Sequence, residues 1–238
     1  MKRVLEICAN SVQSARAAQT GGAQRIELCQ NLEQGGITPS HGLIQRVQEA
    51  LSIPAFVLIR PRPGSFCYDA DEQAIMLADI TACRNLGCAG VVLGALDAAG
   101  QVDVACCQML MAAAGSMQVT FHRAFDACAD QALALETIIA LGCHRLLTSG
   151  GQPSAVAGQE QLALLVRQAA GRISIMPGAG ITPNNIRPLA EYTGATEFHT
   201  SAKRQVVSTA AAVPTEFDTT LPVSDATIVA ELVAQLHF

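Results

Sequence analysis

A regular alternation of short β-like runs with longer amphipathic helical runs limits the fold of this sequence more than any other feature. The β-like runs are Val4–Cys8, Arg25–Cys29, Ala55–Arg60, Gly90–Gly94, Gln118–His122, Arg145–Thr148, Ile173–Met176 and Thr196–His199. Helical patterns follow them near residues 11–20, 40–50, 70–86, 103–114, 130–141, 159–170, 183–192 and 224–236. Strands that alternate with helices predict a parallel sheet with right-handed crossovers.

The number and size of the repeats favour a closed barrel. Eight strand–helix units in 238 residues give about 30 residues per unit, the usual size of a βα unit. Each even-numbered strand also follows a glycine that can end the preceding helix, at Gly22, Gly87, Gly142 and Gly194. A doubly wound open sheet would show the same alternation, but no Gly-x-Gly-x-x-Gly motif follows the first strand. We therefore predict an α/β protein with one domain over residues 1–238, a (β/α)8 TIM barrel.

Residues 203–222 interrupt this alternation. The segment contains Pro214 and Pro222 among several Thr and Ala residues and shows no clear period. We predict a long loop before the last helix. Loops of this length are uncommon in compact domains and often have a function.

Composition and charge argue against several classes of partner. A net charge of −5 with scattered basic residues argues against nucleic-acid binding. No apolar run reaches the roughly 20 residues of a membrane helix, and Glu6 interrupts the stretch that a signal peptide would need, so we expect a cytoplasmic protein without membrane contact. Nine cysteines without a Cys-x-x-Cys pair predict reduced thiols rather than a disulfide framework or a zinc ribbon.

Alternation along the strands turns a set of polar side chains toward the barrel axis. Because Leu5 and Ile7 are apolar and face the helices, Glu6 and Cys8 face inward. The same argument adds Glu27, Cys29, Arg60, Thr120, His122, Glu197 and His199. A buried charge is costly unless it is paired or binds a ligand. The set predicts a functional site, and the alternative is a structural network of salt bridges, such as Glu27 with Arg60.

The ends of the later strands add further candidates. Arg123 and Asp126 follow strand five, where barrel enzymes place catalytic residues, although the two could instead pair with each other. Turns with glycine or serine follow the last three strands and contain Ser149, Gly150, Gly178, Gly180 and Ser201. Glycine lets backbone N–H groups approach an anion, so these turns predict a phosphate or carboxylate site, although tight turns also need glycine.

Several motifs occur in the order found in one known family. They are Glu27-Leu28-Cys29, Ile59-Arg60-Pro61-Arg62, Thr120-Phe121-His122-Arg123-Ala124-Phe125-Asp126, Met176-Pro177-Gly178-Ala179-Gly180 and Glu197-Phe198-His199. From Val4 to Ser201 the chain resembles the CutC family of copper homeostasis proteins, and the match fades beyond that point. The resemblance implies a cytoplasmic (β/α)8 barrel, often a homo-oligomer. It also implies a role in binding or trafficking copper, with Cys8 and Cys29 as Cu(I) ligands.

Two main functions remain open. Thiolates are soft ligands that suit Cu(I), and Cys8 and Cys29 end adjacent strands and point inward. Copper binding leaves the other polar residues without a role, whereas an enzyme would use them as acid–base groups and anion-binding groups: Glu6, Glu27, Arg60, His122, Arg123, Asp126, Glu197 and His199. Such an enzyme would be a lyase or isomerase for a small sugar or a phosphorylated substrate. In it, Glu27, His122 and His199 could ligate a divalent metal. A non-catalytic sensor of a small molecule is the third alternative.

Overall fold

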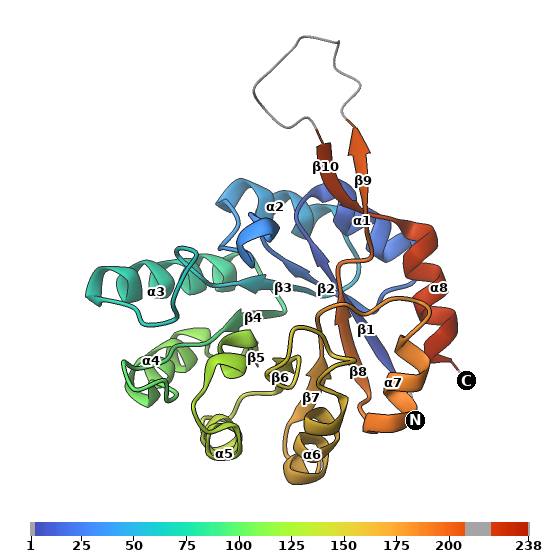
Figure 1. Cartoon of the computed structure of the whole chain (residues 1–238). Coiled ribbons are helices and arrows are strands. Elements are labelled where there is room, and N and C mark those ends of the chain that lie inside the picture. Colours follow the sequence, from blue (N-terminus) through green and yellow to red (C-terminus); the bar gives the residue numbers. More distant parts are fainter. Residues whose placement is uncertain (1–2, 208–219, 238) are drawn as a thin grey trace.

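The computed structural model describes residues 3–207 and 220–237. Eight parallel strands form the wall of a barrel, and helices surround them (Figure 1). The strands are β1 Val4–Ala9, β2 Arg25–Leu28, β3 Ala55–Leu58, β4 Gly90–Leu93, β5 Gln118–Phe121, β6 Arg145–Thr148, β7 Ser174–Pro177 and β8 Glu197–Thr200. The helices are α1 Val12–Thr20, α2 His41–Ala50, α3 Ala70–Asn85, α4 Val104–Ala114, α5 Gln131–Ala140, α6 Gln159–Ala169, α7 Ile186–Thr193 and α8 Ala226–Leu236, with short 3-10 helices η1 Leu32–Gln34 and η2 Arg123–Ala127. The predicted (β/α)8 barrel is confirmed.

The register of the strands fixes which side chains share a level in the barrel. The hydrogen-bonded order runs β7-β6-β5-β4-β3-β2-β1-β8, and β7 and β8 lie next to each other where the barrel nearly closes. Cys8 on β1 pairs with Glu27 on β2, and Glu6 on β1 pairs with His199 on β8. The first two strands and the last strand therefore bring their polar residues together although they are far apart in the sequence.

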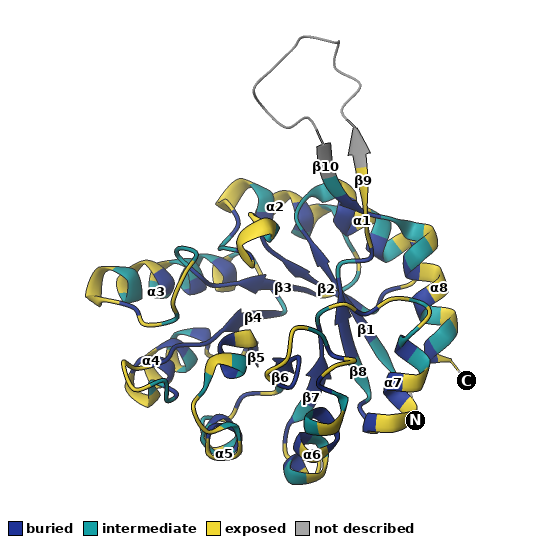
Figure 2. Ribbon diagram, viewed as in Figure 1, coloured by how far each residue is buried: buried dark blue, intermediate teal, exposed yellow. Residues whose placement is uncertain are grey.

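The core lies between the strands and the ring of helices. The eight strands of the barrel are almost entirely buried, while the helices are buried on one side and exposed on the other (Figure 2). Leu5, Ile7 and Phe198 are fully buried on the helix-facing side, as their spacing predicts. Local sequence sets the helix starts, as at α3, where Asp69 and Glu72 form a capping box.

The prediction of a loop over residues 203–222 is wrong at both ends of the segment. Strands β9 Lys203–Val207 and β10 Thr220–Ser224 pair antiparallel and project from the barrel (Figure 1). Pro222 does not prevent this, because each strand of a two-stranded ribbon has a free edge that needs no backbone N–H. The Pro222 carbonyl also accepts a hydrogen bond from Asn10 Nδ2 at 3.1 Å. Residues 208–219, including Pro214, lie outside the described residues.

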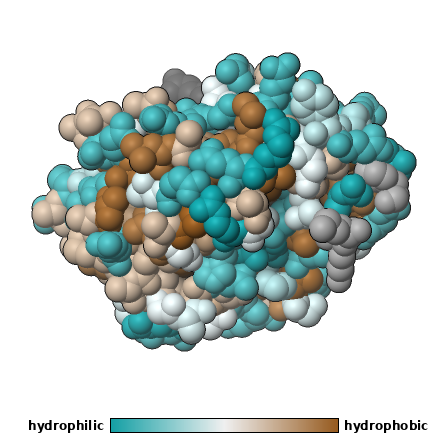
Figure 3. Space-filling view, turned by 90° about the horizontal axis from the view of Figure 1, so that it is seen from below, coloured by the Kyte–Doolittle hydropathy of each residue, from teal (hydrophilic) through white to brown (hydrophobic). Residues whose placement is uncertain are grey.

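The outer surface mixes hydrophobic and hydrophilic residues. On the face that lies below in Figure 1, hydrophobic residues are interspersed with hydrophilic ones (Figure 3). Large exposed apolar side chains include Leu133 on α5 and Leu164 on α6. Among the described residues, no helix has the length and apolar character of a membrane span. The homo-oligomer that the family resemblance implies stays a prediction.

Candidate functional site

A cavity of about 460 Å³ opens at the carboxyl ends of the strands, where barrel enzymes hold their ligands. Its lining includes nine of the residues that the sequence nominated: Cys8, Glu27, Cys29, Arg60, His122, Arg123, Gly180, His199 and Ser201. The other seven candidates do not line it: Glu6, Thr120, Asp126, Ser149, Gly150, Gly178 and Glu197. The strands thus bring the two thiols, both histidines and an arginine to one space.

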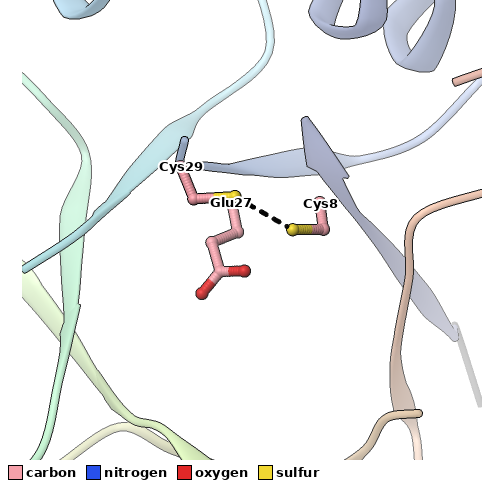
Figure 4. Close-up of side chains that lie close together, drawn as sticks. All are labelled: Cys8, Glu27 and Cys29. Atoms are coloured by element: carbon pink, nitrogen blue, oxygen red, sulfur yellow. Dashed lines mark hydrogen bonds between the residues drawn. The ribbon is translucent and has the colours of Figure 1, made fainter. Parts of the chain in front are cut away.

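Two buried thiols and one carboxyl group form a compact cluster in this cavity. The Cys8 Sγ lies 3.3 Å from the Cys29 Sγ, and the Glu27 side chain lies beside both sulfurs (Figure 4). The possible ligand atoms of the three residues lie within 4.8 Å of one another. The hydrogen bond with Cys29, burial and the nearby Glu27 raise the Cys8 pKa well above its usual value. The Cys8 thiol is therefore protonated at neutral pH, and a metal that binds its sulfur would have to displace a proton.

The two histidines do not join that cluster. Among the described residues, Cys8, Glu27 and Cys29 are the one group of at least three side chains with metal-ligand spacing. His199 uses its Nδ1 at 2.8 Å from Glu6 Oε1, and its Nε2 lies 3.5 Å from Glu27 Oε2. The prediction of a divalent metal held by Glu27, His122 and His199 is therefore not supported by the geometry.

Glu6 and Glu197 lie deeper in the barrel and form salt bridges instead of lining the cavity. Arg25 Nε lies 2.5 Å from Glu6 Oε2, and Arg25 also pairs with Glu197. Arg145 Nε lies 2.8 Å from the same Glu197 oxygen. Burial by itself would raise the Glu6 pKa, but Arg25 and His199 outweigh it and lower the Glu6 pKa to about 2. These two glutamates thus form the kind of salt-bridge network that the sequence leaves open as the alternative to a functional site.

Arg25 and Arg145 were missed in the sequence, although a signal was present. Arg25 lies two residues before Glu27 on the same strand. The alternation that turns Glu27 inward therefore turns Arg25 inward as well. Arg145 likewise lies two residues before Leu147, which lines the cavity, and so faces the same side of its strand. Lys203 was also missed, because its segment was predicted to be a loop.

Glu27 and His199 form the upper level of this network, at the cavity. Burial and the charge of Glu6 raise the Glu27 pKa, although His199 opposes this. Burial alone would lower the His199 pKa, but Glu27 and Glu6 together raise it. Glu27 and His199 are therefore two buried titratable groups of opposite type, 3.5 Å apart at the cavity.

Arg60 does not pair with Glu27. Its guanidinium donates to the carbonyl oxygens of Gly36 at 2.8 Å, Gly64 at 2.9 Å and Gln34 at 3.1 Å. It also lies 5.0 Å from the centre of the Phe66 ring. These contacts fix the side chain, and its positive charge stays available to the cavity.

His122 is held as a neutral ring. Burial and the charge of Arg60 lower the His122 pKa to about 3. Its Nδ1 accepts a hydrogen bond from the Ala124 backbone N–H at 3.2 Å, so the ring proton is on Nε2. That Nε2 is buried and has no partner among the described residues. The ring therefore presents an unused hydrogen-bond donor.

The carboxylate of Asp126 binds the turn that follows β6 and occupies backbone N–H groups that the sequence pattern assigns to an anion. It accepts hydrogen bonds from the backbone N–H groups of Ser149 at 3.1 Å and Gly151 at 3.0 Å. Arg123 Nε lies 2.7 Å from Asp126 Oδ2, the pairing considered from the sequence. Gly150 serves packing, since a Cβ there would lie 2.7 Å from the Gly158 carbonyl oxygen. Of the predicted anion-binding turns, those at Gly180 and Ser201 remain open to the cavity.

Backbone strain gathers at the same end of the barrel. The described residues include four non-glycine residues with positive φ. Three of them lie in the turns after β2, β7 and β8: Asn31 at 54°, Ala179 at 80° and Ala202 at 44°. Such conformations cost about 1–3 kcal/mol each and cluster at functional sites. This supports the cavity as the functional end of the molecule.

Comparison with known proteins agrees with this architecture. The model of the CutC family matches residues 3–204. The chain belongs to the CutC family. A CutC family protein from Xanthomonas axonopodis is 59% identical over 199 residues, covering 84% of this chain and 83% of its own length. Another from Parabacteroides distasonis is 50% identical over 209 residues, covering 87% and 86%.

A solved CutC structure shares the fold. The CutC protein of Streptococcus agalactiae, described as a candidate copper homeostasis protein, superimposes with a TM-score of 0.80 at 32% identity, covering 84% of this chain and 98% of that one. A thiamine phosphate pyrophosphorylase from Pyrococcus furiosus matches with a TM-score of 0.62 at 15% identity, covering 99% and 97%. That second likeness reflects the barrel fold alone.

Proposed function

We propose that this member of the CutC family binds Cu(I) through the thiols of Cys8 and Cys29. The observation that carries the proposal is the 3.3 Å separation of two buried sulfurs at the cavity. Thiolate sulfur is a soft ligand that suits Cu(I), and the neighbouring Glu27 offers an acceptor for a displaced proton. The copper homeostasis role described for the family supports the same metal.

A competition titration tests this function. Under reducing, anaerobic conditions, Cu(I) is titrated against a chelator for the wild type, Cys8→Ser, Cys29→Ser and Cys67→Ser. Cys67 is an exposed thiol on another loop, so its variant controls for loss of any cysteine. We expect each buried-thiol variant to lose at least about tenfold in affinity, a difference of about 1.4 kcal/mol. Equal affinity in all four proteins would reject the site.

A second candidate function is supported by the volume and polarity of the cavity. A space of about 460 Å³ is much larger than a single metal ion requires and is in the range of small-molecule sites. Glu27 and His199 offer a buried proton donor–acceptor pair, and Arg60, Arg123 and Lys203 add positive charge. This arrangement suits a lyase or isomerase that acts on a small sugar or a phosphorylated substrate.

Catalysis is tested with Glu27→Gln and His122→Asn against the exposed controls Glu49→Gln and His41→Asn. Conversion of a panel of small sugar phosphates is followed by proton NMR, and folding by thermal melting. We expect both site variants to stay folded and to lose turnover that the controls keep. If both site variants unfold, the interior polar groups have a structural role. The catalytic function would then be rejected, and copper binding would remain as the proposed function.

A further inference from the structure

The cavity carries positive charge that the protein does not neutralise. Arg60 donates to carbonyl oxygens, and no carboxylate among the described residues pairs with it. Lys203, at the start of β9, likewise forms no ion pair within the described part of the chain. Arg123 is paired with Asp126, and Glu27 faces His199. The excess charge favours an anionic ligand.

His122 adds an oriented hydrogen-bond donor at the same cavity. His122 is 5% exposed, and its Nε2 has no acceptor among the described residues. Leaving a buried donor without a partner costs about 1–3 kcal/mol. Since His122 lines the cavity, a ligand oxygen beside the ring can supply the missing acceptor after a small shift of the side chains that cover Nε2.

Three neighbours fix the direction of this donor. The Ala124 N–H holds Nδ1, and the Phe66 ring packs at a centroid distance of 5.1 Å from the imidazole. Gly94 leaves room for the ring, because a Cβ there would lie 2.7 Å from His122 Nδ1. A donor held from three sides in a neutral ring is preorganised for an oxygen acceptor.

We propose that the cavity binds a small anion that carries a carbonyl oxygen. The anionic group pairs with Arg60 and Lys203, and the carbonyl oxygen accepts a hydrogen bond from Nε2 of His122. Keto acids and keto phosphates share this chemistry. The inference deepens the second candidate function and does not depend on copper binding.

Four probes separate the two parts of the proposal at pH 7. Pyruvate and propionate are both carboxylates of similar size, and pyruvate alone has the keto oxygen. Dihydroxyacetone phosphate and dihydroxyacetone share a keto group, and the phosphate alone carries charge. We expect pyruvate to bind about tenfold more tightly than propionate, the effect of one hydrogen bond, and the phosphate to bind at least about tenfold more tightly than dihydroxyacetone.

His122→Asn tests the donor directly. The Asn Oδ1 can replace Nδ1 as acceptor for the Ala124 N–H, while nothing replaces Nε2. We expect this variant to bind pyruvate no better than propionate. Lys203→Gln should weaken pyruvate and propionate equally, and the exposed control His41→Asn should change neither.

Each outcome decides the matter. If wild-type protein binds none of the charged probes, or binds pyruvate and propionate equally, the proposal is overturned. Nitrogen NMR gives a second, ligand-free reading, because a proton on Nδ1 of His122 at pH 7 would also overturn it. If pyruvate binds as expected but no substrate is converted, this inference stands and the catalytic function fails.

Discussion

Oδ1 of Asp126 lies 2.5 Å from Oγ1 of Thr148, and this hydrogen bond joins η2, which follows β5, to the last residue of β6. The same carboxylate receives the N–H groups of Ser149 and Gly151 and the guanidinium of Arg123. Asp126 does not line the cavity, but its hydrogen bonds hold the end of β6, the turn after it and the cavity residue Arg123 in place.

Asp126→Ala should lower the free energy of unfolding by about 1–3 kcal/mol, because it leaves several buried donors without an acceptor. Urea unfolding measures the change. Asp71→Ala, an exposed aspartate on α3, should stay within about 0.5 kcal/mol of the wild type. Acetate should restore part of the stability of Asp126→Ala, and an unaltered stability in that variant would contradict the assigned role.

Glu6→Gln should be more harmful. The change removes the negative charge that faces both Arg25 and His199 in the barrel interior. Breaking a buried pair on one side costs about 3–5 kcal/mol, since the remaining charge is left unpaired. Chemical unfolding of this variant is compared with that of Glu49→Gln, which alters an exposed pair on α2. Both variants lose one carboxylate charge, so the difference in their stabilities reports the effect of burial. Similar stabilities for the two would mean that the interior network is energetically minor.

The pH dependence of stability should report on His122. Its pKa is lowered to about 3 in the folded protein from an unfolded value of 6.5. As the pH falls below 6.5, the unfolded chain takes up a proton that the folded protein refuses, so the free energy of unfolding decreases. Between pH 7 and pH 5 this loss should be about 2 kcal/mol.

Urea unfolding of the wild type and His122→Asn over that range isolates the contribution. The variant should lose about 2 kcal/mol less than the wild type, because it lacks the titrating ring. If the free energy of unfolding falls equally with pH in both proteins, the pKa of His122 is not lowered by folding.

Gly94→Ala should disturb the same ring by packing. A Cβ at this position would lie 2.7 Å from His122 Nδ1 and 3.1 Å from Phe121 Cε1, so the imidazole has to move. Overpacking of this kind costs about 1–3 kcal/mol. Gly42→Ala on α2 is the matched control, because it meets no atom within 4 Å and should be neutral or stabilising. Equal melting temperatures in the two variants would exclude the tight contact.

The direction of the strand side chains could be predicted from the sequence because one apolar residue fixes the face of its neighbours. Cys8, Glu27 and His199 are at the cavity for this reason. Depth was harder to predict. Glu6 faces inward like Cys8, but it lies two residues earlier on β1. Its side chain is therefore below the cavity, beside Arg25.

Contacts made by turns could not be predicted in the same way. Ser149 and Gly150 have the composition of an anion site, yet their turn is filled by Asp126 from the preceding loop. No period in the sequence relates these two segments. Lys203 was hidden for another reason, since a ribbon with two free edges tolerates the proline that suggested a loop.

The pairing of β1 with β8 has a consequence for how the chain folds. Glu6 and His199 are 193 positions apart, so the interior charges of the first strands stay only partly compensated until the last strand docks. Closing so long a loop is slow, because its entropy is lost before the contact forms. We therefore expect the charge network to be completed as the barrel closes, late in folding. A truncated chain without β8 would have to bury Glu6 and Arg25 without two of their partners.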